Sequence, residues 1–133
     1  MAHERWTTSN KAVSHLGYHL IWCTKYRRKV LVDRAADRVK ELLTEKAATL
    51  GLTIETMEVM PDHVHLFVKA QPIHSPHYLV QQLKGTTSFH LRSEFPSLTS
   101  RLPTLWTRSY YCVSVGHIFA ATIARSSEDQ KRA

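Results

Sequence analysis

The chain has 133 residues, which is enough for one compact domain with a hydrophobic core and too few for two. Its 18 Lys and Arg outnumber its 11 Asp and Glu, so a polyanion such as nucleic acid is the expected partner unless the excess serves only solubility. Its two isolated cysteines argue against a disulfide scaffold or a cysteine-ligated zinc site, and no apolar run could span a membrane or form a signal peptide. We therefore expect a single cytoplasmic domain over residues 1–133.

The first elements in chain order are an arm, a strand and a helix. Residues 1–14 are polar and without periodicity, which predicts a loose basic arm. Residues 18–24 are rich in aromatic and β-branched side chains, which is typical of a strand. A helix is expected next, with Asp33 as its cap and Gly51 at its end. Its apolar positions recur at helical spacing: Ala36, Val39, Leu42, Leu43, Ala47 and Leu50.

A hairpin and a second helix follow. Residues 52–59 and 63–69 predict two strands, and the turn residues Pro61–Asp62 lie between them. Ser75–Pro76 is typical of a helix start, with Ser as cap and Pro in the first turn, and Pro96 ends that helix. Its expected core stripe consists of Val80, Leu83, Thr87 and Leu91.

The last part of the chain predicts a fourth strand and a terminal helix. The strand is expected over 109–115. Gly116 is expected to end it, and a helix is expected over 117–133. The order of elements, βαββαβ plus a final helix, indicates an α+β protein of the ferredoxin-like (RRM-like) class. That class has an antiparallel sheet with two helices on one face.

A pair of histidines lies on the strand 63–69. Because side chains alternate along a strand, His63 and His65 point to one face, whereas Val64 and Leu66 point to the other. Two imidazoles two residues apart can share one divalent cation. The alternative is that they are ordinary half-exposed histidines.

The surrounding stretch, residues 57–68 with the sequence MEVMPDHVHLFV, resembles the HUH strand of the single-tyrosine transposases of small insertion sequences, the insertion-sequence 200/605-like and REP-associated group. The similarity extends through residues 18–28, 83–86, 105–111 and 115–117 and covers the chain from about 15 to 130. It implies a homodimeric DNA transposase that acts on single-stranded DNA hairpins at the ends of a mobile element. Such enzymes cleave and rejoin strands through a 5′-phosphotyrosine.

The resemblance also implies a cofactor and its ligands. In this family Mg²⁺ or Mn²⁺ is held by the two histidines and a glutamine of the terminal helix, which correspond here to His63, His65 and Gln130. An amide oxygen suits such a hard cation. In relatives the terminal helix can complete the partner's site, so shared active sites are a further expectation.

The sequence departs from the family at the nucleophile. Family members carry the tyrosine one helical turn before the glutamine, and that position is Ser126 here. A serine hydroxyl ionises far less readily than a phenol and reaches less far, so cleavage should be impaired. Three explanations are open: a natural copy that has lost activity, a deliberately altered sequence, or replacement by another tyrosine such as Tyr110 or Tyr111. The first two are favoured together.

Basic and aromatic residues supply a candidate DNA-binding surface. Cations can position phosphates without reading sequence, and aromatic rings can stack on unpaired bases. His19 and His117 are expected to be structural. The candidate residues are Lys25, Tyr26, Arg27, Arg28, Lys84, Arg92, Trp106, Arg108 and Tyr110.

Two other functions compete with the transposase. One is a catalytically inactive module that grips hairpin DNA or RNA, or represses its relatives, and the loss of tyrosine favours it. The other is metal-dependent hydrolysis through an activated water, for which Asp62 is the adjacent candidate base.

Overall fold

The computed structural model describes residues 15–118. The expected arm 1–14, most of the expected terminal helix, Ser126 and Gln130 lie outside the described residues.

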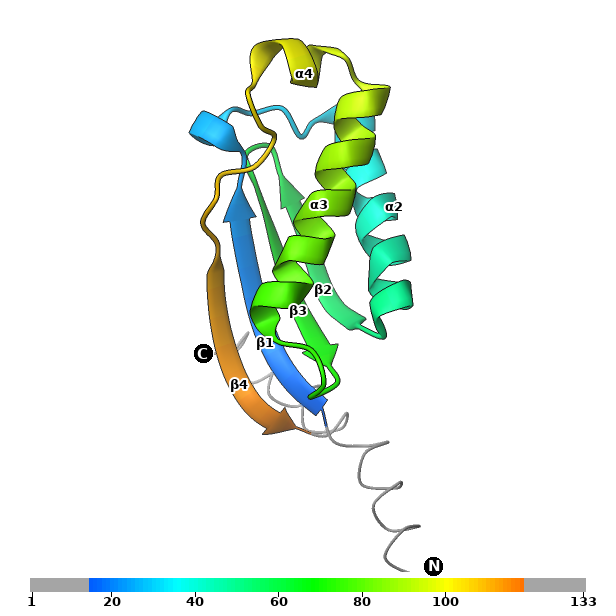
Figure 1. The fold of residues 1–133 in the computed structure, drawn as a ribbon, viewed down its shortest axis with the longest axis vertical. Coiled ribbons are helices and arrows are strands. Elements are labelled where there is room, and N and C mark those ends of the chain that lie inside the picture. Colours follow the sequence, from blue (N-terminus) through cyan, green and yellow to red (C-terminus); the bar gives the residue numbers. More distant parts are fainter. Residues whose placement is uncertain (1–14, 119–133) are drawn as a thin grey trace, which may run out of the picture.

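The described chain forms one four-stranded sheet with helices on one face. The strands lie in the order β2-β3-β1-β4, and each neighbouring pair is antiparallel. Figure 1 shows α2 and α3 side by side over the same face of this sheet. This arrangement confirms the predicted α+β, ferredoxin-like architecture. The elements are β1 (His15–Cys23), the 3₁₀ turn η1 (Lys25–Arg27), α2 (Asp33–Leu50), β2 (Thr53–Met60), β3 (His63–Ala70), α3 (Pro76–Glu94), α4 (Ser97–Arg101) and β4 (Tyr111–Ile118).

Helix α2 ends where predicted, but its N-terminal cap differs from the prediction. Gly51 ends it with φ +70, a left-handed conformation that glycine adopts without steric cost. Asp33 does not cap it: Val32 holds that position without a side-chain hydrogen bond, and Asp33 itself has φ 54. The helix also buries Ala35, whereas Ala36 is partly exposed.

Helix α3 begins and ends as predicted. The Ser75 hydroxyl oxygen accepts a hydrogen bond from the Tyr78 N–H at 3.1 Å, and Pro76 occupies the first turn. At the other end the Phe95 N–H donates to the Leu91 carbonyl before Pro96. The predicted stripe is buried, together with Leu79.

Strand β4 is shifted along the sequence relative to the prediction. It runs from Tyr111 to Ile118, and Gly116 pairs with Gly17 inside the sheet, next to a register shift. Pairing with β1 thus continues past Gly116, so a terminal helix beginning at 117 is wrong. Glycine marks an irregularity of the strand here and not its end.

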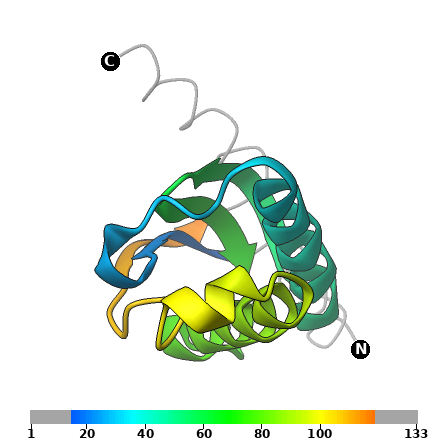
Figure 2. The ribbon, with the colours of Figure 1, turned by 90° about the horizontal axis from the view of Figure 1, so that it is seen from above.

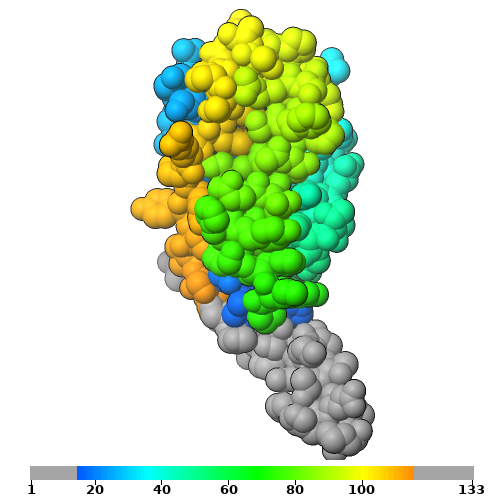
Figure 3. All heavy atoms as spheres, in the orientation of Figure 1, coloured from blue at the N-terminus to red at the C-terminus, as the bar shows by residue number. Residues whose placement is uncertain are grey.

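The core lies between the helices and the sheet. The apolar side chains of β1 and β3 that face the helices, including Leu20, Trp22, Val64 and Leu66, are at most 1% exposed. Trp22 also meets Trp106 edge-on at 5.9 Å between ring centroids. Figure 2, seen from above, shows the helices on one side of the curved sheet. Figure 3 shows the atoms of α3 in the centre of the molecular face on the helical side. None of the helices in the described part of the chain is long and apolar enough to span a bilayer.

Candidate functional site

His63 and His65 project from the face of the sheet that α2 and α3 leave uncovered. Between them Val64 is fully buried against the helices, and strand alternation therefore directs both imidazoles to the opposite face. Their side chains are 30% and 31% exposed. The predicted juxtaposition of the two histidines on one face is present in the fold.

The His63 ring is oriented by its neighbour in the β2–β3 turn. Its Nδ1 lies 2.8 Å from Asp62 Oδ1, while Asp62 Oδ2 accepts hydrogen bonds from Arg27 at 3.0 Å and 3.1 Å. The hydrogen bond with His63, followed by that with Arg27, lowers the pKa of Asp62. An ionised carboxylate can only accept, so His63 donates from Nδ1, and in the neutral imidazole this leaves the lone pair on Nε2. This is the tautomer that a metal-binding imidazole needs.

His65 lies between an acid and a third histidine. Its Nδ1 is 3.3 Å from Glu58 Oε1 on β2, and its Nε2 is 3.4 Å from His19 Nδ1 on β1. His19 also stacks on Phe67 at 4.5 Å between ring centroids. Burial, followed by the nearby His65, lowers the pKa of His19, which therefore favours its neutral form.

His19 and Glu58 belong to this cluster but were not predicted from the sequence. His19 was expected to be structural, yet the β1–β3 and β2–β3 registers bring both side chains beside His65. Strand register depends on pairing between distant segments, so no local pattern could have identified them. Within residues 15–118 no three His, Cys, Asp or Glu side chains are arranged to hold a metal ion.

A strained basic turn, residues 25–29, adjoins the histidines. Tyr26 and Arg27 have φ 59 and 54, which is uncommon for residues other than glycine. The turn is held in place by Thr24, whose hydroxyl donates to the Arg28 carbonyl at 2.6 Å and whose N–H donates to the Asp62 carbonyl at 3.0 Å. Tyr26 is 63% exposed, and the Lys25 ammonium lies 5.3 Å from its ring centroid. The turn therefore presents an aromatic ring and several cations next to His63.

Two predicted DNA-binding residues have structural roles instead. Trp106 is 5% exposed, and its indole N–H donates to the Thr87 hydroxyl at 3.0 Å, so it cannot serve as a stacking platform. The Lys84 ammonium is buried and donates to the carbonyls of Thr107, Arg108 and Ser109 at 2.6, 3.3 and 3.4 Å. Burial also lowers the pKa of Lys84. Sequence composition alone could not distinguish these side chains from surface ones.

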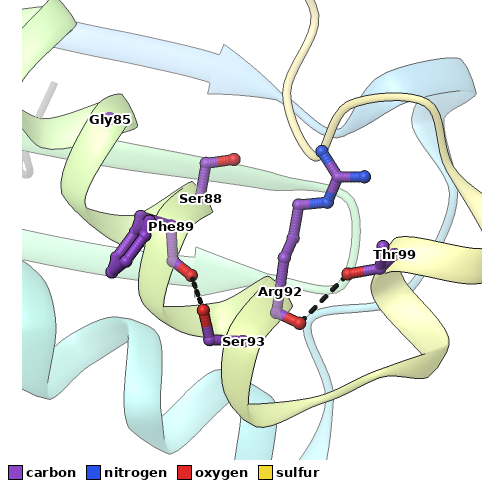
Figure 4. A pocket seen from close by; sticks show the side chains of 6 residues that line it. All are labelled: Gly85, Ser88, Phe89, Arg92, Ser93 and Thr99. Carbon is purple, nitrogen blue, oxygen red and sulfur yellow. Dashed lines mark hydrogen bonds between the residues drawn. The ribbon is translucent and has the colours of Figure 1, made fainter.

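Arg92 is likewise engaged within the chain. Its guanidinium donates to the carbonyls of Leu102 and Pro103 at 3.1 and 3.2 Å and so fastens the segment after α4. Figure 4 shows it in a shallow pocket between α3 and α4, beside the hydrogen bond from the Thr99 hydroxyl to the Arg92 carbonyl. This pocket is lined by residues of α3 and by Thr99 of α4, on the helical side of the sheet, whereas the histidine pair is on the opposite face.

Of the remaining candidates, Arg28 and Arg108 are exposed and Lys25 is partly exposed. Tyr110 is half-buried, with its hydroxyl 3.3 Å from His77 Nδ1. These cations and Tyr26 remain available to a ligand.

Known proteins resemble this chain over most of its length. The family model described as "Transposase IS200 like" matches residues 12–126. The ISDra2 transposase TnpA of Deinococcus radiodurans is 42% identical over 120 residues, which cover 89% of this chain and 86% of that protein. The transposase of insertion sequence element IS200 from Salmonella typhimurium is 27% identical over 118 residues, covering 87% and 72% of the two chains.

Solved structures give the same result. A crystal structure assigned to a transposase of D. radiodurans R1 has a TM-score of 0.70 and 38% identity, and the match covers 89% of this chain and 90% of that one. A REP-associated tyrosine transposase bound to a REP hairpin shares the fold, with a TM-score of 0.55 at 10% identity over 76% and 56% of the chains. By the family match and the 42% identity, this chain belongs to the IS200-like transposase family.

Proposed function

We propose that this transposase binds single-stranded hairpin DNA at the histidine pair, using Mg²⁺ or Mn²⁺ held by His63, His65 and Gln130. The observation that carries the proposal is the hydrogen-bonded chain Arg27–Asp62–His63, which leaves His63 Nε2 free for a ligand next to a basic turn. Two imidazoles and an amide oxygen are a suitable donor set for such a cation. When bound, the cation would polarise the scissile phosphate and offset its developing charge.

The protein's own residues have separate parts in this proposal. Asp62 fixes the His63 ring, and Arg27 fixes Asp62. Arg28 and Lys25 of the basic turn contact phosphates without reading sequence, while the exposed ring of Tyr26 stacks on an unpaired base. Both carboxylate oxygens of Asp62 are engaged and its pKa is lowered, so it is a poor base, which speaks against water-activated hydrolysis.

Hairpin binding and a homodimer with shared active sites are part of the same proposal. The REP-associated tyrosine transposase named above, which shares the fold of this chain, is bound to a hairpin and supports this part of the proposal. The net charge of +7 suits either a single strand or a hairpin.

We further propose that this chain is deficient in cleavage. Family members attack the phosphate with a tyrosine, and Ser126 stands at that position. A phenol ionises near a pKa of about 10, whereas an aliphatic hydroxyl is a much poorer anion and reaches less far. DNA and metal binding would survive this change, because His63, His65 and Gln130 are retained.

The test compares the chain with its Ser126→Tyr variant on end-labelled hairpin DNA in the presence of Mn²⁺. We expect strand cleavage and a covalent protein–DNA adduct only with Ser126→Tyr. The matched control is Ser127→Tyr, which adds the same side chain one position further on and should give no adduct. Cleavage by the unmodified chain would mean that another nucleophile exists and that Ser126 is wrongly aligned.

Metal binding is tested separately from cleavage by titrating Mn²⁺ into the DNA-free protein and following the free ion by electron paramagnetic resonance. His63→Ala should weaken binding at least tenfold, as is typical when a ligand or its support is lost. His74→Ala, which removes a histidine stacked on Tyr78 at the start of α3, should not. Equal binding by all three proteins would refute the metal site.

The alternative function is an inactive DNA- or RNA-binding module that represses related elements, and Ser126 is the observation that favours it. The same experiment separates the two. If Ser126→Tyr binds the hairpin and Mn²⁺ but never cleaves, the chain has lost more than its nucleophile and the binding module is the better description.

A further inference from the structure

Between β1 and β4 the sheet opens into a pocket of about 280 Å³. Its walls are Ile21 to Cys23 of β1 and, facing them, the loop 107–110 with Tyr111. Pairing holds the two segments together on either side, at Ile21–Tyr111 and at Thr24–Trp106. The Thr107 N–H also donates to the Cys23 carbonyl at 3.0 Å, so residues 108–110 are the surplus length between the last paired positions, beside the pocket.

Three backbone donors of the loop, the N–H groups of residues 108–110, are turned away from the helices. The Lys84 ammonium donates hydrogen bonds to the carbonyls of Thr107, Arg108 and Ser109. In a trans peptide the carbonyl and the following N–H point in opposite directions, so the N–H groups of residues 108–110 point away from Lys84. None of them donates to a described residue. Ser109 and Tyr110 line the pocket whereas Lys84 does not, so the N–H groups of these two residues are the donors nearest to it.

The wall formed by β1 adds no donor to the pocket. Trp22 is 1% exposed and its indole Nε1 is buried in the core beside Trp106, so the indole does not donate to a molecule in the pocket. No carboxylate lines the pocket, and the ammonium of Lys84 lies behind the loop. The pocket therefore suits a ligand that is rich in acceptors.

The pocket adjoins the histidine pair. Its β1 residues Ile21 and Cys23 are the register partners of His65 and His63. Residues directly opposite in antiparallel strands have Cβ atoms about 5 Å apart. Tyr111, 72% exposed on the other wall, supplies an aromatic ring at the mouth. A DNA strand whose phosphate lies at the histidines would pass this opening.

We propose that the pocket binds one unpaired base of the DNA strand, beside the phosphate held at the histidine pair. This inference rests on the proposed function. The volume is just below the range of roughly 300–1,000 Å³ typical of small-molecule pockets, which suits a single flat ring system. The carbonyl and ring-nitrogen acceptors of a base match the peptide donors of Ser109 and Tyr110, and the tyrosine rings can stack on its face.

The experiment uses a fluorescently labelled DNA hairpin with unpaired flanks in which each flanking position is replaced in turn by an abasic site. Affinity is measured by fluorescence anisotropy for the unmodified chain and for Ser109→Phe, which fills the pocket, with Ser109→Ala as the control. For the unmodified chain and the control, we expect one abasic position to weaken binding roughly five- to a hundredfold. Ser109→Phe should bind the intact DNA about as weakly as the unmodified chain binds the DNA with that abasic site. The abasic site should then cause no further loss of affinity in Ser109→Phe.

A second variant, Tyr111→Ala, changes an exposed wall residue without filling the pocket and should reduce the effect of the same abasic site. If Ser109→Phe keeps the full abasic effect, or binds intact DNA normally, the base does not enter this pocket and the inference is overturned while the proposed function stands. If no variant and not even the unmodified chain binds the hairpin, the proposed function itself fails.

Discussion

The role of Lys84 can be decided by replacing it with methionine, which keeps most of the side-chain volume and removes the charge. The sequence suggested a phosphate contact, whereas the fold places the ammonium against three carbonyls of the loop 107–110. If the structural role is right, Lys84→Met destabilises the protein. If the DNA role is right, it lowers DNA affinity and leaves stability unchanged.

The expected loss of stability follows from the distances. The hydrogen bond to Thr107 at 2.6 Å is short and charge-assisted, while those at 3.3 and 3.4 Å are long and contribute less. A hydrogen bond to a charged group contributes about 1.5–3 kcal/mol, and a carbonyl left without its donor adds a desolvation cost. Removing the charge also removes the cost of burying it, which is the cause of the lowered pKa of Lys84, and this offsets part of the lost stability. We therefore expect a net loss of about 2 kcal/mol.

The measurement is urea unfolding followed by circular dichroism, with the free energy of unfolding extrapolated to water. Lys40→Met on the exposed side of α2 is the matched control and should change stability by less than about 0.5 kcal/mol. A Lys84→Met protein as stable as the control would refute the structural role. The reasoning would also fail if the variant were stabilised.

Two further predictions follow from the fold. Gly51→Ala should lower the free energy of unfolding by roughly 1–2 kcal/mol, because alanine disfavours the φ of +70 at this position. Gly85→Ala should raise it, since an added Cβ there meets nothing within 4 Å. Urea unfolding compares the two variants, and equal effects would contradict the argument. The pKa of Glu94 is lowered by its hydrogen bond with Arg38, so the pair stabilises the fold above the ordinary pKa and loses this effect as pH falls through the lowered value. The melting temperatures of Glu94→Gln and the unmodified chain should therefore differ at pH 7 and converge as the pH falls below the lowered pKa of Glu94; a difference independent of pH would exclude the ionic contribution.

Local pattern predicted most of the elements because the signals are short-range. The cap Ser75 and the stop at Gly51 act through hydrogen bonds and backbone conformation within one helical turn, so both could be read directly. The start of α2 and the end of β4 were misplaced because other segments set them: the Leu31 N–H donates to the Pro61 carbonyl just before α2, and β1 keeps β4 paired beyond Gly116.

The amino-acid sequence by itself determined the α+β class and the placement of His63 and His65 on one face, since strand alternation is a property of the backbone. Only the tertiary structure decided what surrounds them. The strand register places His19 and Glu58 beside His65, and the packing of distant segments buries Lys84 and Trp106, which the sequence had suggested as surface residues. The physical reason is that alternation and capping depend on neighbours in the chain, whereas register and burial depend on segments tens of residues away.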